Sequence, residues 1–130
     1  MKILIADDDK ELCQLLSAIL RTQGHEVLFA FDAMQTLTSA RNNTPDVIVL
    51  DINMPGGTGV GALEKLKINM KTSAIPVLVI TASAAELHSS RMKQIGAAEF
   101  MQKPLDAGEF CEAINRIAGL PAMPTSVQNG

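Results

Sequence analysis

Three consecutive aspartates, Asp7, Asp8 and Asp9, follow a short apolar segment near the start of the chain. Adjacent carboxylates repel each other, and each raises the pKa of its neighbour unless a cation shares the site. A divalent ion such as Mg2+ takes oxygen ligands and commonly binds through one or two carboxylates. Asp9 suits another role, because a helical pattern begins directly after it and aspartate is a favourable N-cap. We therefore predict that Asp7 and Asp8 bind a metal ion; the alternative is that one of these acids merely caps the helix.

Three more reactive side chains stand at the ends of apolar segments. Asp51 follows the run Val47–Leu50, Thr81 ends a second run, and Lys103 ends a third, directly before a proline. A carboxylate can act as a nucleophile and form an aspartyl phosphate. A metal ion and an ammonium group stabilise the charge of a transferring phosphoryl group, and a hydroxyl can donate a hydrogen bond to it. Each residue alone is weak evidence, since an aspartate at a strand end is usually a turn or cap residue, but the set predicts phosphoryl transfer.

The segments that lead into these residues are typical of strands in a parallel sheet. Five short apolar segments predict strands at residues 2–7, 25–30, 46–51, 76–81 and 99–103. Nearly continuous apolar runs are expected where both faces of a sheet are covered. Ligands of such sheets bind beyond the carboxyl ends of the strands. The acid pair and the three residues above all fall at that edge, which supports a functional role for them.

Amphipathic segments between the strands predict five helices. Asp32, Ser83 and Asp106 are suited to cap helix starts, and Gly24 and Gly96 are suited to end helices. Apolar residues at helical spacing predict the inner faces, in chain order Leu12, Leu15, Leu16, Ile19 and Leu20; Met34, Leu37 and Ala40; Val60, Leu63, Leu66 and Met70; and Phe110, Ala113, Ile114 and Ile117. Strands that alternate with helices imply right-handed crossovers and an α/β fold whose parallel sheet is covered on both sides.

The composition is that of a single globular domain. The 130 residues are 47% hydrophobic and 19% charged, which is ordinary for such proteins. No apolar run reaches the roughly 20 residues that span a bilayer, and the N-terminus lacks the regions of a signal peptide, so we expect a cytoplasmic protein without a membrane partner. A net charge of -3 argues against direct binding to nucleic acid. We expect the domain to cover residues 1–119 and residues 120–130 to form a flexible tail or linker.

The cysteines and histidines have no spacing typical of a metal or catalytic site. Cys13 and Cys111 lie far apart in predicted helices, and a disulfide is not expected in the cytoplasm, so we expect buried free thiols. His25 and His88 are isolated and are interpreted as surface or boundary residues. The chemistry of the chain is therefore expected to depend on the acids, the hydroxyl and the amine at the strand ends.

The chain resembles a response-regulator receiver domain over about residues 1–118. The residues that carry the resemblance are the acid pair Asp7-Asp8, Asp51 at the end of the third strand, Thr81-Ala82, Lys103-Pro104, and Met54-Pro55 and Gly59 after Asp51. The resemblance implies a single doubly wound, five-stranded parallel sheet with five helices, of the flavodoxin-like type with strand order 2-1-3-4-5. It also implies a switch of two-component signalling rather than an enzyme, although such a domain catalyses its own phosphorylation and dephosphorylation.

By this resemblance the matched positions take roles in a phosphorylation switch. The implied roles are phosphoacceptor for Asp51, phosphate binding for Lys103, Mg2+ binding for Asp7, Asp8, Asp51 and the backbone carbonyl of Asn53, and switching for Thr81 and Phe100. A sensor histidine kinase or a phosphotransfer protein would donate the phosphoryl group. The signal would reach a partner protein or an effector domain through the surface of the fourth helix, the fifth strand and the fifth helix. A homodimer through the same surface is a further expectation.

Some positions depart from the usual pattern of this family. The loop reads Gly56-Gly57-Thr58-Gly59, where the family more often carries Met-Asp before its glycine. Three glycines in four residues predict a more mobile loop than usual. Phe100 lacks the hydroxyl of the tyrosine found in many relatives, so its ring can rotate but cannot take part in a hydrogen-bonded readout. Asn53 and Ser83 lie where the family tunes the lifetime of the phosphate.

Two other functions stay open on the sequence. A phosphatase of the haloacid-dehalogenase type also uses a strand-end aspartate, Mg2+, a hydroxyl and a lysine, but an acid follows its nucleophile by two residues. That position here is Asn53, which cannot act as a general acid. A degenerate receiver that only binds proteins is the second alternative, and the complete set of site residues argues against it.

Overall fold

The structure is a computed structural model, and it describes residues 1–53, 59–83 and 90–119. Some predictions concern residues outside these ranges, namely Met54-Pro55, the loop residues Gly56, Gly57 and Thr58, His88, and the tail at residues 120–130. Most of the predicted capping sequence that begins at Ser83 also lies outside them. These points stay predictions of the sequence.

Five parallel strands form one sheet in the order β2-β1-β3-β4-β5. The strands are β1 (Lys2–Ala6), β2 (Glu26–Ala30), β3 (Val47–Asp51), β4 (Val77–Thr81) and β5 (Glu99–Gln102), each within one residue of its predicted ends. Ala6 pairs with Leu50, and Asp51 pairs with Ile80. This register aligns the carboxyl ends of β1, β3 and β4 at one edge. The predicted strand order 2-1-3-4-5 is confirmed.

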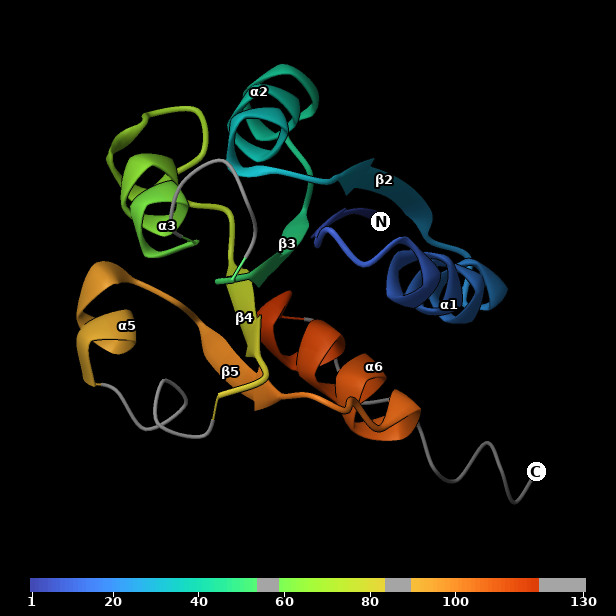
Figure 1. Ribbon diagram of the computed structural model, residues 1–130. Helices are drawn as coiled ribbons and strands as arrows, with labels where there is room; N and C mark the ends of the chain where they lie inside the picture. The colour runs from blue at the N-terminus through green and yellow to red at the C-terminus, as the bar shows by residue number, and fades with distance from the viewer. Residues whose placement is uncertain (54–58, 84–89, 120–130) are drawn as a thin grey trace.

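Helices cover both faces of the sheet (Figure 1). The described helices are α1 (Lys10–Thr22), α2 (Ala33–Asn43), α3 (Gly59–Ile68), α5 (Ser90–Ile95) and α6 (Ala107–Ile117). Side chains alternate between the two faces along a strand. Ile3 and Ile5 therefore pack with α1 and α6, whereas Leu4 and Ala6 pack with α2 and α3. The doubly wound architecture is confirmed.

The predicted helix ends rest on caps that the structure shows directly. The side chains of Asp9, Asp32 and Asp106 each accept a hydrogen bond from the backbone N–H three residues later, at 3.1, 2.7 and 2.9 Å. Each such cap satisfies one N–H that the first turn of a helix leaves unpaired. Gly24 and Gly96 follow α1 and α5 with φ of 86° and 117°, a conformation that glycine adopts at little cost. Within the described residues, no helix is both long enough and apolar enough to cross a membrane.

Three residues predicted on inner helix faces lie on the surface instead. The exposed fractions are 58% for Leu15, 70% for Met34 and 95% for Met70. Leu15 lies about 150° around the helix axis from the centre of the buried arc of α1, which is formed by Cys13, Leu16, Ser17 and Leu20. Met34 is in the first turn of α2, and Met70 follows the end of α3. Apolar spacing predicts a helix, but the packed neighbours decide which arc of it is buried.

Candidate functional site

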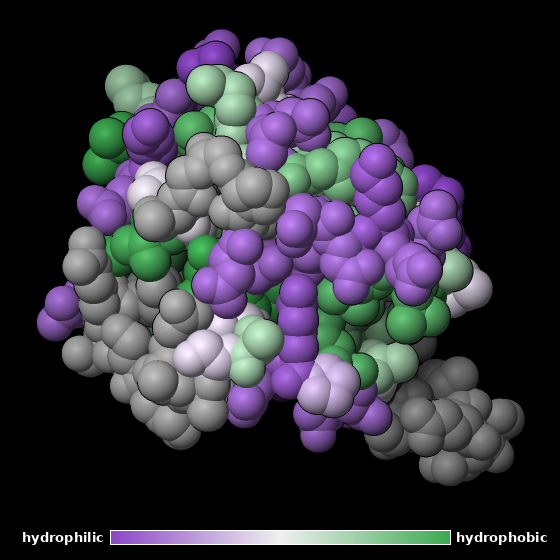
Figure 2. Space-filling model, in the orientation of Figure 1, coloured by the Kyte–Doolittle hydropathy of each residue, from purple (hydrophilic) through white to green (hydrophobic). Residues whose placement is uncertain are grey.

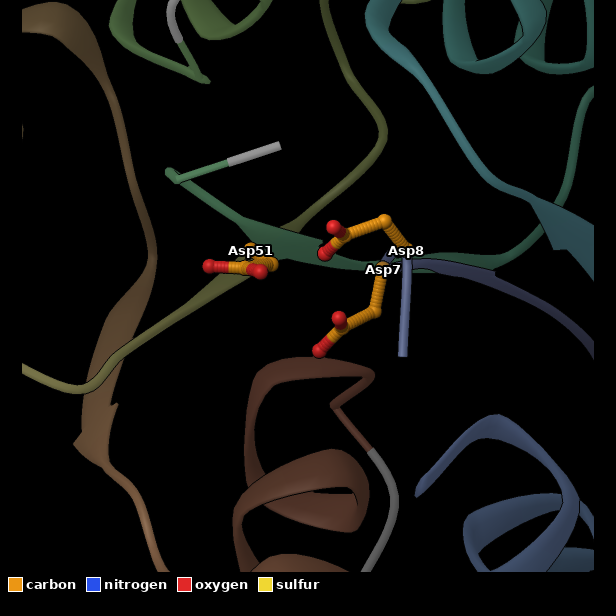
Figure 3. Close-up of side chains that lie close together, drawn as sticks. All are labelled: Asp7, Asp8 and Asp51. Atoms are coloured by element: carbon orange, nitrogen blue, oxygen red, sulfur yellow. The ribbon is translucent and has the colours of Figure 1, made fainter. Parts of the chain in front are cut away.

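The ends of β1 and β3 bring three carboxylates together (Figure 3). One oxygen from each of Asp7, Asp8 and Asp51 lies within 4.8 Å of the others. Asp7 and Asp51 are buried, whereas Asp8 is exposed. The two strands are neighbours in the sheet, and the residues before these acids pair in register. Acids that are far apart in the sequence therefore face one small volume.

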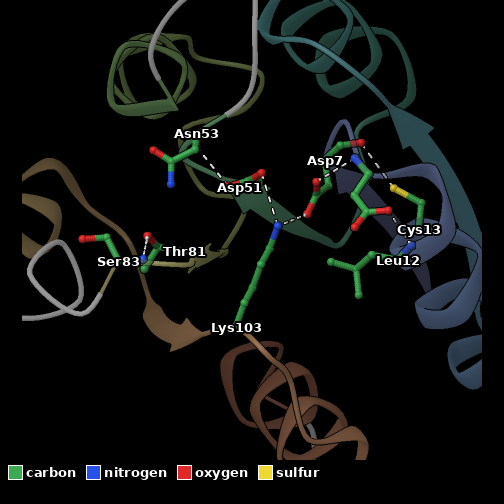
Figure 4. A network of polar contacts seen from close by, with 9 residues as sticks. Asp7, Leu12, Cys13, Asp51, Asn53, Thr81, Ser83 and Lys103 are labelled. Carbon is green, nitrogen blue, oxygen red and sulfur yellow. Dashed lines mark hydrogen bonds and ion pairs between the residues drawn. The ribbon is translucent and has the colours of Figure 1, made fainter.

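Lys103 reaches between two of these acids (Figure 4). Its Nζ lies 2.8 Å from Oδ2 of Asp7 and 3.4 Å from Oδ2 of Asp51. Lys103 follows β5, and its backbone N–H donates to the carbonyl of Thr81 at 2.8 Å, which ties it to the end of β4. Charges in a partly buried site interact strongly, because water screens them little. The lysine therefore links the ends of β1, β3 and β4.

Burial and charge together shift the pKa values in this cluster. Burial raises the pKa of the Asp7 carboxyl, and the nearby ammonium group of Lys103 offsets this only in part. Burial alone would lower the pKa of Lys103, but the carboxylates of Asp7 and Asp51 outweigh it and raise that pKa. Three carboxylates face one ammonium group, so the site has an excess of negative charge that favours a further cation.

The donor atoms of the site fit a hard divalent cation. Oδ1 of Asp7 accepts a hydrogen bond from the N–H of Asp9 at 2.9 Å, and Oδ1 of Asp51 accepts one from the N–H of Asn53 at 3.0 Å. Oδ2 of Asp7 is buried and, among the described residues, accepts no hydrogen bond of regular geometry, although Lys103 forms an ion pair with it. A buried carboxylate oxygen is costly to leave uncompensated, and the ammonium group of Lys103 compensates this one. The oxygen-only donor set suits Mg2+ better than a soft metal.

The other predicted site residues follow β3 or belong to β4 and β5. Thr81 is buried at the end of β4, and its Oγ1 accepts a hydrogen bond from the N–H of Ser83 at 3.0 Å. Phe100 lies in β5, is half-buried and packs against the core on the side of α2 and α3. Asn53 follows β3, and its side chain is exposed. The sheet order therefore places Thr81 and Phe100 on the β4–β5 side of Asp51.

Two contacts at the site are not predicted by the sequence. The buried thiol of Cys13 donates to the backbone carbonyl of Asp7 at 3.3 Å, and burial raises the pKa of this thiol to about 11, so that it stays protonated at neutral pH. The N–H of Gly59 donates to the carbonyl of Ile52 at 3.0 Å, and a Cβ on Gly59 would lie 2.1 Å from the Cα of Ile52. The signals that could indicate them are a thiol four residues after a capping aspartate and a glycine at a helix start.

Comparisons with known proteins agree with this geometry. The family described as response regulator receiver domain matches residues 3–115. The chain belongs to the receiver-domain family. Protein PilH of Pseudomonas aeruginosa is 36% identical over 116 residues, which cover 89% of this chain and 96% of PilH. The transcriptional regulatory protein CpxR of Escherichia coli (strain K12) is 34% identical over 116 residues, but the chain spans only 48% of its length.

A solved structure of a relative matches this receiver domain in shape. It is the receiver domain of sensor histidine kinase PA1611 from Pseudomonas aeruginosa, with a magnesium ion coordinated in the active site cleft. It is 26% identical, covers 91% of this chain and 97% of its own, and has a TM-score of 0.81. Receiver domains are signalling domains of two-component systems that interact with histidine kinases and effectors. The predicted class is confirmed, and neither the phosphatase nor the binding scaffold is favoured.

Proposed function

We propose that the chain is a phosphorylation-controlled switch in which Asp51 accepts a phosphoryl group from a histidine of a kinase or a phosphotransfer protein. The observation that carries the proposal is the buried pair of Asp7 and Asp51 with Lys103 between them. An oxygen of Asp51 would attack the phosphorus and form a P–O bond, while the P–N bond breaks and its electron pair stays on the imidazole nitrogen. The product would be an aspartyl phosphate on this chain.

The charge of the site supports this chemistry. Asp7, Asp8, Asp51 and the backbone carbonyl of Asn53 would hold the Mg2+ ion that the donor set suits. When bound, this ion would neutralise negative charge on the carboxylates and on the phosphoryl oxygens. Lys103 is a compact point charge that can pair with the free carboxylate of Asp51 and afterwards with the phosphate. The magnesium in the receiver domain of PA1611 supports the same assignment.

The output would pass through Thr81 and Phe100. Thr81 would move inward so that its hydroxyl donates to a phosphoryl oxygen. The half-buried ring of Phe100 would then rotate into the space that Thr81 leaves. Such a rotation would change the surface of α5, β5 and α6, where a partner protein, an effector domain or a second copy of the chain would bind. The charge of the added phosphoryl group would in this way shift the surface of α5, β5 and α6 between two conformations.

The wider assignments follow from the same proposal. The chain would catalyse only its own phosphorylation and dephosphorylation and would not act as an enzyme on other molecules. Residues 1–119 would form the receiver domain, residues 120–130 would form a tail or linker, and the domain would work in the cytoplasm.

Beryllofluoride, a mimic of the phosphoryl group, tests the proposal. The chain has no tryptophan or tyrosine, so fluorine NMR of the bound mimic is a better measurement than intrinsic fluorescence. We expect a bound signal only when Mg2+ is present, and no bound signal for Asp51→Asn. Asp106→Asn is the matched control, because it removes one carboxylate near the same edge while asparagine still caps α6.

Two results would contradict the proposal. One is an Asp51→Asn variant that binds beryllofluoride as the unchanged chain does. The other is rapid and repeated release of phosphate from small phosphomonoesters, which would indicate a phosphatase. If phosphorylation switches this surface, bound beryllofluoride should shift the amide NMR signals of α5, β5 and α6. Unchanged signals there would show that the output uses another surface.

A further inference from the structure

A small cavity lies between α2 and α3. Its volume is about 140 Å³, and its lining consists of Leu37, Arg41, Lys65, Leu66, Asn69 and Thr72. Helix α2 starts after the carboxyl end of β2 and ends before the amino end of β3, so Arg41 lies at the amino edge of the sheet. The cavity is therefore at the edge opposite to Asp51.

The size of this cavity limits what can enter it. Pockets that bind cofactors or other small molecules usually have volumes of about 300–1,000 Å³. A water molecule takes up about 30 Å³ of liquid. The cavity therefore has room for one side chain or a few waters, but not for a nucleotide.

Two cations at this cavity have no acidic partner among the described residues. Arg41 and Lys65 are exposed, and the salt bridges found in residues 1–53, 59–83 and 90–119 involve neither of them. Lys71 is a third exposed cation nearby in the chain. Lys67 is different, because its Nζ donates to the carbonyls of Ser73 and Ile75 at 3.2 and 2.7 Å and is thereby used within the fold. The whole chain has a net charge of -3, whereas Arg41 and Lys65 place two cations at this cavity.

Two large, exposed apolar side chains follow Lys65 in the chain. The exposed fractions are 83% for Ile68 and 95% for Met70. Both residues belong to the stretch from the end of α3 to Thr72, which also supplies Asn69 to the cavity. In Figure 2, hydrophobic and hydrophilic side chains lie interspersed at the upper left, where Figure 1 draws α3 and the segment that follows it. A contiguous apolar patch with a polar rim is typical of a protein interaction site, and Ile68 and Met70 supply exposed apolar area at the end of α3.

We propose that this α2–α3 surface, formed by Leu37, Arg41, Lys65, Ile68, Asn69 and Met70, docks an acidic and apolar segment of a partner protein. A carboxylate of the partner would enter the cavity beside Arg41 and Lys65, and a neighbouring apolar side chain would cover Ile68 and Met70. Charge complementarity selects this occupant, because unpaired cations favour an acidic ligand. The apolar side chains favour a peptide over nucleic acid, which binds through phosphate contacts and aromatic stacking. Docking here would leave the carboxyl edge of the sheet uncovered, since the two sites lie at opposite edges.

A short synthetic peptide of alternating aspartate and leucine, with blocked ends, is the probe. Added to the full chain, it should shift the amide NMR signals of residues 37–43 and 65–72 and should bind more weakly as salt is raised. The double variant Arg41→Gln and Lys65→Gln should weaken binding about tenfold, because each exposed ion pair contributes up to about 1 kcal/mol. Arg21→Gln is the matched control, since it removes an exposed cation from α1 on the other face.

Each other outcome counts against the proposal. Binding that the double variant does not weaken, or shifts that map to another surface, would overturn it. A peptide with serine in place of leucine that binds equally well would show that Ile68 and Met70 do not contribute to binding. A DNA oligonucleotide that binds these residues more tightly than the peptide would replace the protein partner by nucleic acid. Thermal unfolding of the double variant should match that of the unchanged chain, so that weaker binding cannot be ascribed to misfolding.

Discussion

The two edges of the sheet hold their charges in opposite ways. At the carboxyl edge, Asp7 and Asp51 are buried and share the ammonium group of Lys103. At the amino edge, Arg41 and Lys65 are exposed and form no salt bridge with the described residues. Water and salt screen exposed charges, whereas buried charges interact strongly and are costly to leave unpaired. The carboxyl edge is therefore suited to chemistry, and the amino edge is suited to weak and reversible contacts.

Packing differs between the edges as much as charge does. At the carboxyl edge α3 begins against the backbone of Ile52, with Gly59 at the contact. At the amino edge Gly24 has no atom within 4 Å of the position where a Cβ would stand. A substitution at the first edge must move backbone atoms, while one at the second edge meets only an unfavourable backbone angle. The difference can be measured with single substitutions.

The largest effect is expected for Gly59→Ala. Its Cβ would overlap the Cα of Ile52, so the start of α3 must move, and we expect the free energy of unfolding to fall by about 3 kcal/mol. Gly24→Ala is the control, since its φ of 86° costs an alanine about 1 kcal/mol without any overlap. Urea unfolding of both variants gives the comparison. Equal losses would show that the close approach at Ile52 does not limit the fold.

The next effect is expected for Lys103→Gln. Without the ammonium group, the carboxylates of Asp7 and Asp51 face each other with no cation between them, and we expect the free energy of unfolding to fall by about 2 kcal/mol. Breaking a fully buried ion pair typically costs about 3–5 kcal/mol. The smaller loss is expected here because the side chain of Lys103 is 23% exposed. Mg2+ should stabilise the variant more than the unchanged chain. Without the ammonium group the three carboxylates should bind the ion more tightly, and a ligand that binds only the folded state raises its stability.

An exposed ion pair provides the control for Lys103. Arg116 pairs with Glu99 on the surface, where water screens both charges, so Arg116→Gln should leave the urea midpoint unchanged. A drop as large as that for Lys103→Gln would mean that burial does not separate the two ion pairs. A variant of Lys103 that gains nothing more from Mg2+ would argue against a metal ion among the three acids.

The smallest effect is expected at His25, near the amino edge. Burial lowers the pKa of this imidazole, and the nearby positive charge of the N-terminus lowers it further; the Met1 nitrogen lies 3.1 Å from Nδ1. The unfolded chain keeps a histidine pKa of about 6.5, so below that pH it binds more protons than the folded chain does. The free energy of unfolding should therefore fall as the pH drops below about 6.5 and level off once the folded form is also protonated.

His25→Asn tests this assignment, because asparagine does not titrate in this range. Urea unfolding between about pH 8 and pH 5 should show a shallower dependence on pH for the variant than for the unchanged chain. The same dependence in both would assign the effect to other groups. A steeper dependence in the variant would mean that the folded state raises the pKa of His25 instead.

The sequence predicts best what depends on chain neighbours. The caps at Asp9, Asp32 and Asp106 act on backbone groups three residues away, so their positions can be inferred without a fold. The strand segments are equally local, since each is a short apolar run between helical patterns. Exposure depends on distant contacts instead, and for this reason Leu15 and Met70 are wrongly predicted on inner faces.

The residue types at the candidate site, the strands that carry them and their common edge follow from the sequence alone. Only the tertiary structure decides that Lys103 lies between Asp7 and Asp51, that Gly59 meets Ile52, and that a cavity between α2 and α3 has two cations at its rim. The physical reason is the range of the forces involved. Strand and helix signals arise from nearest neighbours along the chain, whereas pairing, burial and cavities arise from packing between segments that the sequence keeps far apart.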